Sequence, residues 1–178
     1  MSGLDVETRS GIRFSGSDEL IGIVSSWDLS RVGETGYGLV VTRSRVIGAR
    51  RPDPDDEFMA YLGPGSTATD DDRARAAATA SRLLGSAQFV LPRDDIAQIL
   101  YRQPGLFSGG FVVFKTQLKA FKVEIPVVSG WNEGPLRASR VLIESLKAFS
   151  PERLYDGRTG ALYVEEVLKR GERVAPSG

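Results

Sequence analysis

The sequence predicts an α+β protein that is mainly β: an antiparallel barrel or sandwich closed by an amphipathic helix near the C-terminus. Three observations support this prediction. Apolar and polar residues alternate over Glu19–Trp27 and Ala120–Ile125, which is typical of strands with one buried face. The apolar runs Leu39–Val41 and Val46–Ile47 flank a polar tetrapeptide, which indicates a hairpin. Apolar residues recur at helical spacing over Leu136–Phe149.

Composition restricts the class of protein and its partners. The chain has 178 residues, 41% of them hydrophobic, which suits one domain with additions. The formal net charge is 0, so no global attraction to nucleic acid is expected. Met1–Arg9 lacks the basic and apolar regions of a secretion signal, and no apolar run approaches the ~20 residues that span a bilayer. Together with the lack of cysteine, this predicts a cytoplasmic protein without a transmembrane segment.

The chain contains no histidine and no cysteine. Histidine is the side chain best suited to acid and base catalysis near neutral pH, and both residues are the usual ligands of zinc. We therefore expect a non-enzymatic protein with no metal and no cofactor. A carboxylate-dependent enzyme remains an alternative. The adjacent Asp94 and Asp95 do not favour it, because neighbouring side chains diverge on an extended chain.

In chain order, residues 1–16 are polar and glycine-spaced, which predicts a loose N-terminal segment. A strand is predicted over Glu19–Trp27, and Asp28–Thr35 is expected to form a loop. The hairpin then turns at Thr42–Arg45. Residues 53–87 are interpreted as an insertion resting on the surface of the core, with a short extended piece at Phe58–Leu62.

The insertion carries the strongest helix signal of the chain. Thr69 and Asp72 have the spacing of a capping box before the alanine-rich segment Arg73–Leu84. Gly85 follows where a helix is expected to end. The apolar stripe of this helix is small, so we expect it to bury little. Its members are Ala76, Ala80, Leu83 and Leu84.

The second half of the chain predicts further strands and helices. Extended segments are expected at Gln88–Leu91 and Ile96–Arg102, and a second hairpin pairs Phe111–Phe114 with Ala120–Ile125. In the return strand, alternation points Phe121, Val123 and Ile125 inward and Lys122 and Glu124 outward.

The C-terminal part follows the amphipathic helix Leu136–Phe149. Ser150 and Pro151 are expected to end that helix and to begin one more turn through Leu154 and Tyr155. A third helix is predicted over Ala161–Arg170. Residues 151–178 thus form a helical C-terminal extension and tail.

Three segments of the chain, in this order, resemble the segments of a known domain family. Gly38–Ile47 resembles the strand, Thr-x-x-Arg turn and strand of bacterial pleckstrin-homology-like (PH-like) and GRAM-like domains. Leu91–Ile99 is similar to the proline, acidic and isoleucine step before their later strands. Gly110–Ile125 followed by Leu136–Phe149 resembles their last strands and closing helix. The resemblance implies a PH-like domain over residues 17–150, interrupted by the insertion.

Such domains include lipid-headgroup binders and protein binders, so the resemblance implies a binding or scaffolding module. Lipid binders of the pleckstrin type cluster basic residues in the loop after the first strand. Here that loop, Asp28–Thr35, offers only Arg31. The primary expectation is therefore protein interaction, with another protein or a second copy of the chain as partner. No nucleic acid is expected.

Arg43, Arg45, Arg50 and Arg51 form the densest basic group and are the candidate ligand-binding residues. Guanidinium groups recognise phosphate and carboxylate bidentately, so the group favours binding to an anionic ligand or to the headgroups of a peripheral membrane.

In the alternative interpretation these arginines are solvated charges of the hairpin that pair with acidic neighbours. Asp53, Asp55 and Asp56 follow closely in the sequence. Strand alternation also divides the group, because it places Arg45 and Arg51 on one face and Arg50 on the other.

Overall fold

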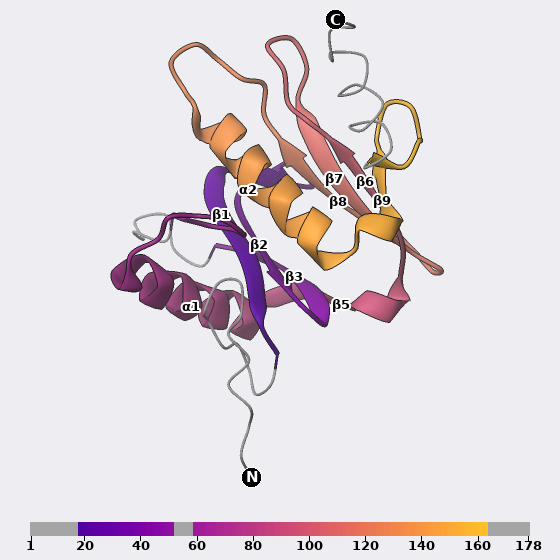
Figure 1. The fold of residues 1–178 in the computed structure, drawn as a ribbon. Coiled ribbons are helices and arrows are strands. Elements are labelled where there is room, and N and C mark those ends of the chain that lie inside the picture. Colours follow the sequence, from indigo (N-terminus) through magenta and orange to yellow (C-terminus); the bar gives the residue numbers. More distant parts are fainter. Residues whose placement is uncertain (1–17, 52–58, 164–178) are drawn as a thin grey trace, which may run out of the picture.

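The computed structural model describes residues 18–51 and 59–163 (Figure 1). The helices are α1 (Asp70–Gly85), α2 (Gly134–Phe149) and the short 3₁₀ helices η1 (Arg93–Asp95) and η2 (Pro151–Arg153). The strands are β1 (Leu20–Arg31), β2 (Glu34–Thr42), β3 (Arg45–Arg50), β4 (Ala60–Leu62), β5 (Ala87–Pro92), β6 (Ile96–Arg102), β7 (Gly110–Thr116), β8 (Ala120–Ile125) and β9 (Leu154–Asp156). The predictions for residues 1–16, for most of the helix Ala161–Arg170 and for the tail lie outside the described residues.

The nine strands form one sheet, which confirms the mainly β, α+β class. The order is β5-β3-β2-β1-β8-β7-β6-β9, and β4 pairs with β1. A single residue pair, Ser30 with Glu124, joins β1 to β8 and so links the two halves of the sheet. In the described residues no ladder joins the end strands β5 and β9, so the sheet is open and is not a barrel closed by hydrogen bonds.

The main hydrophobic core, here called the inner core, lies between the sheet and α2. Helix α2 crosses the sheet in Figure 1 and buries Leu142, Leu146 and Phe149. Side chains from both halves of the sheet meet in this core. The ring of Phe89 in β5 lies 4.9 Å from that of Phe121 in β8, centroid to centroid. Each fully buried side chain of this size contributes roughly 1.5–3 kcal/mol, and the inner core therefore holds the two halves together where one residue pair cannot.

Helix α1 forms under the predicted capping box. Thr69 accepts a hydrogen bond from the Asp72 backbone N–H, and the Asp72 side chain accepts one from the Thr69 N–H. Contrary to the expectation that this helix buries little, it covers the outer face of β1, β2 and β3 and forms a second hydrophobic core. Ala80 and Leu83 are 0% and 1% exposed there. The small residues of the helix let its backbone come close to the sheet. Its few apolar side chains therefore suffice to form a close-packed core.

The predicted hairpin β2–β3 turns at Arg43 and Ser44, as expected from the sequence. Asp18 fastens this turn. Its carboxylate accepts hydrogen bonds from the hydroxyls of Thr42 and Ser44, at 2.8 and 2.7 Å.

The expected loop Asp28–Thr35 is instead continuous strand around a two-residue turn, Val32 and Gly33. Both residues have positive φ, 54° and 78°. This is the backbone of a tight hairpin turn whose twist matches that of the flanking strands. The prediction failed because valine is disfavoured at positive φ and gives no turn signal.

The hairpin β7–β8 has the predicted alternation. Phe121, Val123 and Ile125 are buried, whereas Lys122 and Glu124 are exposed and their charged groups lie 2.8 Å apart. The short piece expected within Phe58–Leu62 is β4, which pairs with β1.

Helix α2 ends before Ser150 and one more turn begins at Pro151, as expected, but this turn, η2, ends at Arg153, and Leu154 and Tyr155 form β9. This three-residue strand pairs with β6 and is parallel to it, whereas the expected sheet was antiparallel. Ion pairing between Arg93 and Glu152, at 3.0 Å, connects η1 to η2 next to this strand. The pKa of Glu152 is lowered, first by its own backbone N–H and then by the Ser150 hydroxyl.

Candidate functional site

Arg43 and Arg45 lie at the β2–β3 turn and each contacts a carboxylate. Arg43 forms an ion pair with Glu19, and the Nε of Arg45 lies 3.3 Å from Asp18. Glu19 and Asp18 immediately precede β1, so these partners come from the start of the sheet.

Arg50 and Arg51 lie at the opposite end of β3, about 16 Å along the strand. Arg50 forms an ion pair with Glu34 at 3.3 Å. Arg51 is 5% exposed, and its guanidinium stacks on the ring of Trp27 at 4.9 Å. The four predicted arginines thus do not form one surface.

The acidic neighbours suggested as partners of these arginines, Asp53, Asp55 and Asp56, lie outside the described residues. Among the described residues, the carboxylates that contact Arg43, Arg45 and Arg50 are those of Glu19, Asp18 and Glu34, respectively.

The carboxylates give little basis for acid and base chemistry. Asp94 and Asp95 are both exposed. The pKa of Asp72 is lowered by hydrogen bonds from the Thr69 backbone and side chain, which is opposite to the shift that a general acid needs. Within the described residues, no group of three His, Cys, Asp or Glu side chains is placed to hold a metal ion.

The most unusual surface of the molecule lies at one end of the sheet, on two neighbouring loops. The β6–β7 loop (residues 103–109) carries Leu106 and Phe107, which are 67% and 98% exposed. The β8–α2 loop (residues 126–133) carries Val127 and Trp131, which are 46% and 100% exposed. We call these four residues the apolar end. Large side chains of this kind are normally buried, and their concentration on one surface is typical of an interaction site.

The two loops are joined and lie together at the top of Figure 1. The Val128 N–H donates a hydrogen bond to the Gly105 carbonyl at 3.0 Å. This bond joins the Phe107 loop to the Trp131 loop at one end of the sheet.

Each aromatic side chain stands at a tight turn that the backbone itself closes. The Asn132 N–H donates to the Ser129 carbonyl at 3.1 Å, which closes the turn that carries Trp131. The Gly105 N–H donates to the Ser108 carbonyl at 2.8 Å, which closes the turn that carries Phe107. The two rings therefore project from defined backbone positions, which lowers the entropy lost on binding.

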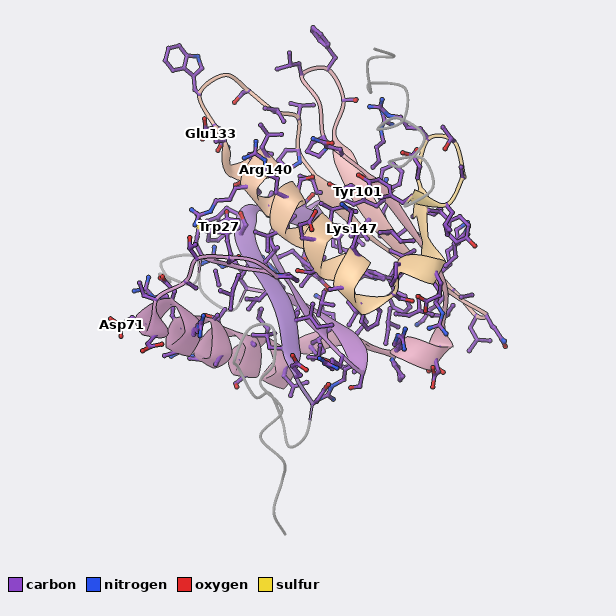
Figure 2. The ribbon with its side chains drawn as sticks, viewed as in Figure 1. Trp27, Asp71, Tyr101, Glu133, Arg140 and Lys147 are labelled. Carbon is purple, nitrogen blue, oxygen red and sulfur yellow. The ribbon has the colours of Figure 1, made fainter. Side chains whose placement is uncertain are left out.

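The Trp131 loop is also fastened to the body of the protein. The Asn132 side-chain amide donates to Asp28 of β1 at 3.1 Å, and its oxygen accepts a hydrogen bond from the Gly134 N–H at 2.9 Å. Figure 2 shows the next residue, Glu133, at the start of α2. The loop therefore has a fixed base beneath its exposed ring.

Sequence reasoning missed the apolar end because it treated both segments as connections. The signal that was present is compositional. Leu106, Phe107 and Trp131 stand among glycine, proline, serine and asparagine, with no apolar residue at strand or helix spacing to share a buried face. A large apolar residue in that setting has no core to enter.

The described helices include none long and apolar enough to cross a membrane. No protein-family model, curated protein or solved structure matches the chain.

Proposed function

We propose that this protein is a non-enzymatic binding module that contacts another protein through the apolar end. The observation that carries the proposal is the exposure of Phe107 and Trp131, 98% and 100%, on two loops that a backbone hydrogen bond joins. Aromatic side chains at defined positions supply most of the free energy at many protein interfaces, because they bury a large area at a small entropic cost. A partner with an apolar pocket would remove both rings from water.

The charge of these loops favours a protein over a membrane surface. Across residues 103–109 and 126–133 the only charged side chain is that of Glu133. An anionic bilayer attracts lysine and arginine near its surface, and these loops supply neither. A pocket on a protein needs no such attraction, since burial of the aromatic rings suffices.

The fold proposal is a PH-like domain over residues 17–150 with a helical insertion at residues 53–87. Two features support it. Antiparallel pairing of neighbouring elements runs through β1, β2 and β3 and again through β6, β7 and β8. Helix α2 follows the last hairpin and packs against β1, as expected for a closing helix.

The test uses full-length protein as bait with the double variant Phe107→Ser/Trp131→Ser. Chemical cross-linking in lysate followed by mass spectrometry identifies the proteins captured. We expect partners that bind the wild type and are lost with the double variant, with the cross-links mapping to residues 103–109 and 126–133. Val32→Ser is the matched control, because Val32 is 85% exposed on the β1–β2 turn and lies outside the apolar end.

Two results would overturn the proposal. One is an identical set of captured proteins for the wild type and the double variant. The other is binding of the wild type to neutral phosphatidylcholine vesicles that the double variant lacks, which would make the apolar end a membrane contact. Sedimentation equilibrium of both proteins shows whether the partner is a second copy of the chain.

A further inference from the structure

A groove lies beside the edge strand β5, at the opposite end of the sheet from the apolar end. One side of β5 pairs with β3, where Val46 faces Leu91 and Gly48 faces Phe89. Among the described strands none pairs with the other side. The backbone of that side is therefore available to an added strand.

A groove of about 760 Å³ runs along this free side, between β5, η1 and the β7–β8 turn. Its floor is apolar and consists of Phe89, Leu91, Ile96 and Phe121, all 8% exposed or less. Leu118 lies at the edge of the groove, and its side chain is 95% exposed. An edge strand next to an apolar groove is the arrangement that binds extended peptides, because the backbone supplies affinity and the groove accepts alternate side chains.

Charges are separated along the length of the groove. The ammonium of Lys119 lies 5.1 Å from the centre of the Phe121 ring, which itself lies 4.9 Å from that of Phe89, so this charge is beside the first half of β5. Asp94 and Asp95 follow the last residue of β5, Pro92. In the described part of the chain no ion pair engages Lys119, Asp94 or Asp95. The guanidinium of Arg153, also on the rim, donates to the Arg93 carbonyl.

From this groove we infer that β5 binds an extended peptide segment of a partner protein. The segment carries a large apolar side chain over Phe89 and Phe121, an acidic side chain toward Lys119 and a basic side chain toward Asp94 and Asp95. An extended ligand presents every second side chain to the same face, so the three side chains that face the groove occupy alternate positions, with the charged pair four residues, about 13 Å, apart.

The experiment uses labelled peptides of alternating threonine with two orders of charge, Thr-Lys-Thr-Leu-Thr-Glu-Thr and Thr-Glu-Thr-Leu-Thr-Lys-Thr. A third peptide has serine at both charged positions. Fluorescence anisotropy with the full chain measures each Kd. We expect one charged order to bind at least fivefold more tightly than the serine peptide, because antiparallel and parallel addition to β5 require opposite orders.

Variants then assign the binding to the groove. Asp94→Asn/Asp95→Asn and Lys119→Gln change exposed residues and are expected to leave the fold intact. Each variant is expected to raise the Kd of the preferred charged peptide at least threefold and to leave the Kd of the serine peptide unchanged. Amide hydrogen exchange of residues 88–91 is expected to slow when the preferred peptide binds. Phe107→Ser, at the apolar end, is the control that changes none of these values.

Three outcomes contradict the inference. The peptides bind without regard to charge order, they do not bind, or β5 is covered by a second copy. Covering by a second copy would appear as a concentration-dependent dimer that Asp94→Asn/Asp95→Asn dissociates. Because this site is separate from the apolar end, each outcome leaves the proposed function to its own experiment.

Discussion

Gly22 of β1 lies directly beneath Ser145 of α2. A Cβ atom added to Gly22 would stand 2.8 Å from the Cβ of Ser145 and 3.0 Å from the Leu62 carbonyl oxygen. The Ser145 hydroxyl donates a hydrogen bond to the Val141 carbonyl at 2.7 Å, so this polar group has a partner within its own helix although it packs against the strand. Helix and strand therefore approach as closely as two small residues allow.

Gly22→Ala should accordingly destabilise the protein by about 2 kcal/mol through overpacking. Urea denaturation measures the change. Gly85→Ala is the control, because a Cβ there meets no atom within 4 Å. A double-mutant cycle with Ser145→Gly should show favourable coupling, since the second change opens the space that the first one fills. Equal stability of Gly22→Ala and the wild type would show that α2 is not held this closely.

A substitution at Leu83 tests how much the packing of α1 on the sheet contributes to the stability of the protein. Leu83 is 1% exposed in the second hydrophobic core, between α1 and the sheet, and lies over Gly38 of β2. Leu83→Ala should lower the free energy of unfolding by about 3 kcal/mol, as cavities in close-packed cores do. The neighbouring Leu84, which is only partly buried, provides the control variant Leu84→Ala with a smaller loss. Similar small losses for both would indicate that the helix can leave the sheet without cost.

Val32 at φ 54° is the only non-glycine residue with positive φ in the described part of the chain, and its side chain is 85% exposed. A β-branched residue in this conformation costs about 1–2 kcal/mol, whereas asparagine followed by glycine is the preferred sequence for such a turn. Val32→Asn should therefore raise the free energy of unfolding by about 1 kcal/mol. Val32→Ala should raise the free energy of unfolding by less. It removes the branched side chain but keeps a Cβ atom at positive φ. A loss with Val32→Asn would contradict this account of the turn.

The capping box of α1 should make stability depend on pH. Hydrogen bonds from the Thr69 backbone and hydroxyl hold the pKa of Asp72 below its ordinary value of 3.8. The charged carboxylate accepts these bonds, so the stabilisation is complete above the ordinary pKa and is lost as the pH falls through the lower folded value.

Thermal unfolding between pH 6 and pH 2 measures this dependence. Asp72→Asn should lower the Tm at pH 6, and the difference from the wild type should shrink as the pH falls. Asp71→Asn is the control, since Asp71 lies in the same first turn of α1 and has no part in the capping box. A difference that stays constant across this range would exclude the carboxylate as the cause.

The four arginines of the hairpin β2–β3 test binding to anionic membranes. Arg43, Arg45 and Arg50 already contact carboxylates, and Arg51 is 5% exposed. We expect the wild type to sediment equally with phosphatidylcholine vesicles and with vesicles containing phosphatidylserine, at both low and high salt. The double variant Arg43→Ala/Arg50→Ala should behave in the same way. Salt-sensitive binding to the anionic vesicles that this variant loses would instead support the hairpin as a lipid site.

The elements that sequence predicted well are those whose signal is local. Alternation in Ala120–Ile125 requires one buried and one exposed face, and the structure has both. The Thr69 and Asp72 pair marks a helix start because the two side chains satisfy backbone N–H groups that nothing else satisfies. Neither inference depends on distant parts of the chain.

The missed features depend on tertiary contacts. Three residues, Leu154–Asp156, are too short to show periodicity, and β6 alone makes them a strand. The hairpin arginines are close in sequence, but the described carboxylates that contact three of them, Asp18, Glu19 and Glu34, come from other segments. The apolar end combines residues about 20 positions apart that one backbone hydrogen bond brings together. Such contacts join residues that are distant in the sequence, so the hydrophobic pattern of a short segment does not predict them.

The full exposure of Trp131 makes the protein its own spectroscopic reporter. The chain has two tryptophans, and the other, Trp27, lies under the Arg51 guanidinium on the body of the sheet. A Trp27→Phe variant would leave one indole, in water, whose emission is red-shifted and readily quenched by iodide. Docking of the apolar end would move that emission to shorter wavelength and shield it from the quencher. Binding could then be followed without any attached dye.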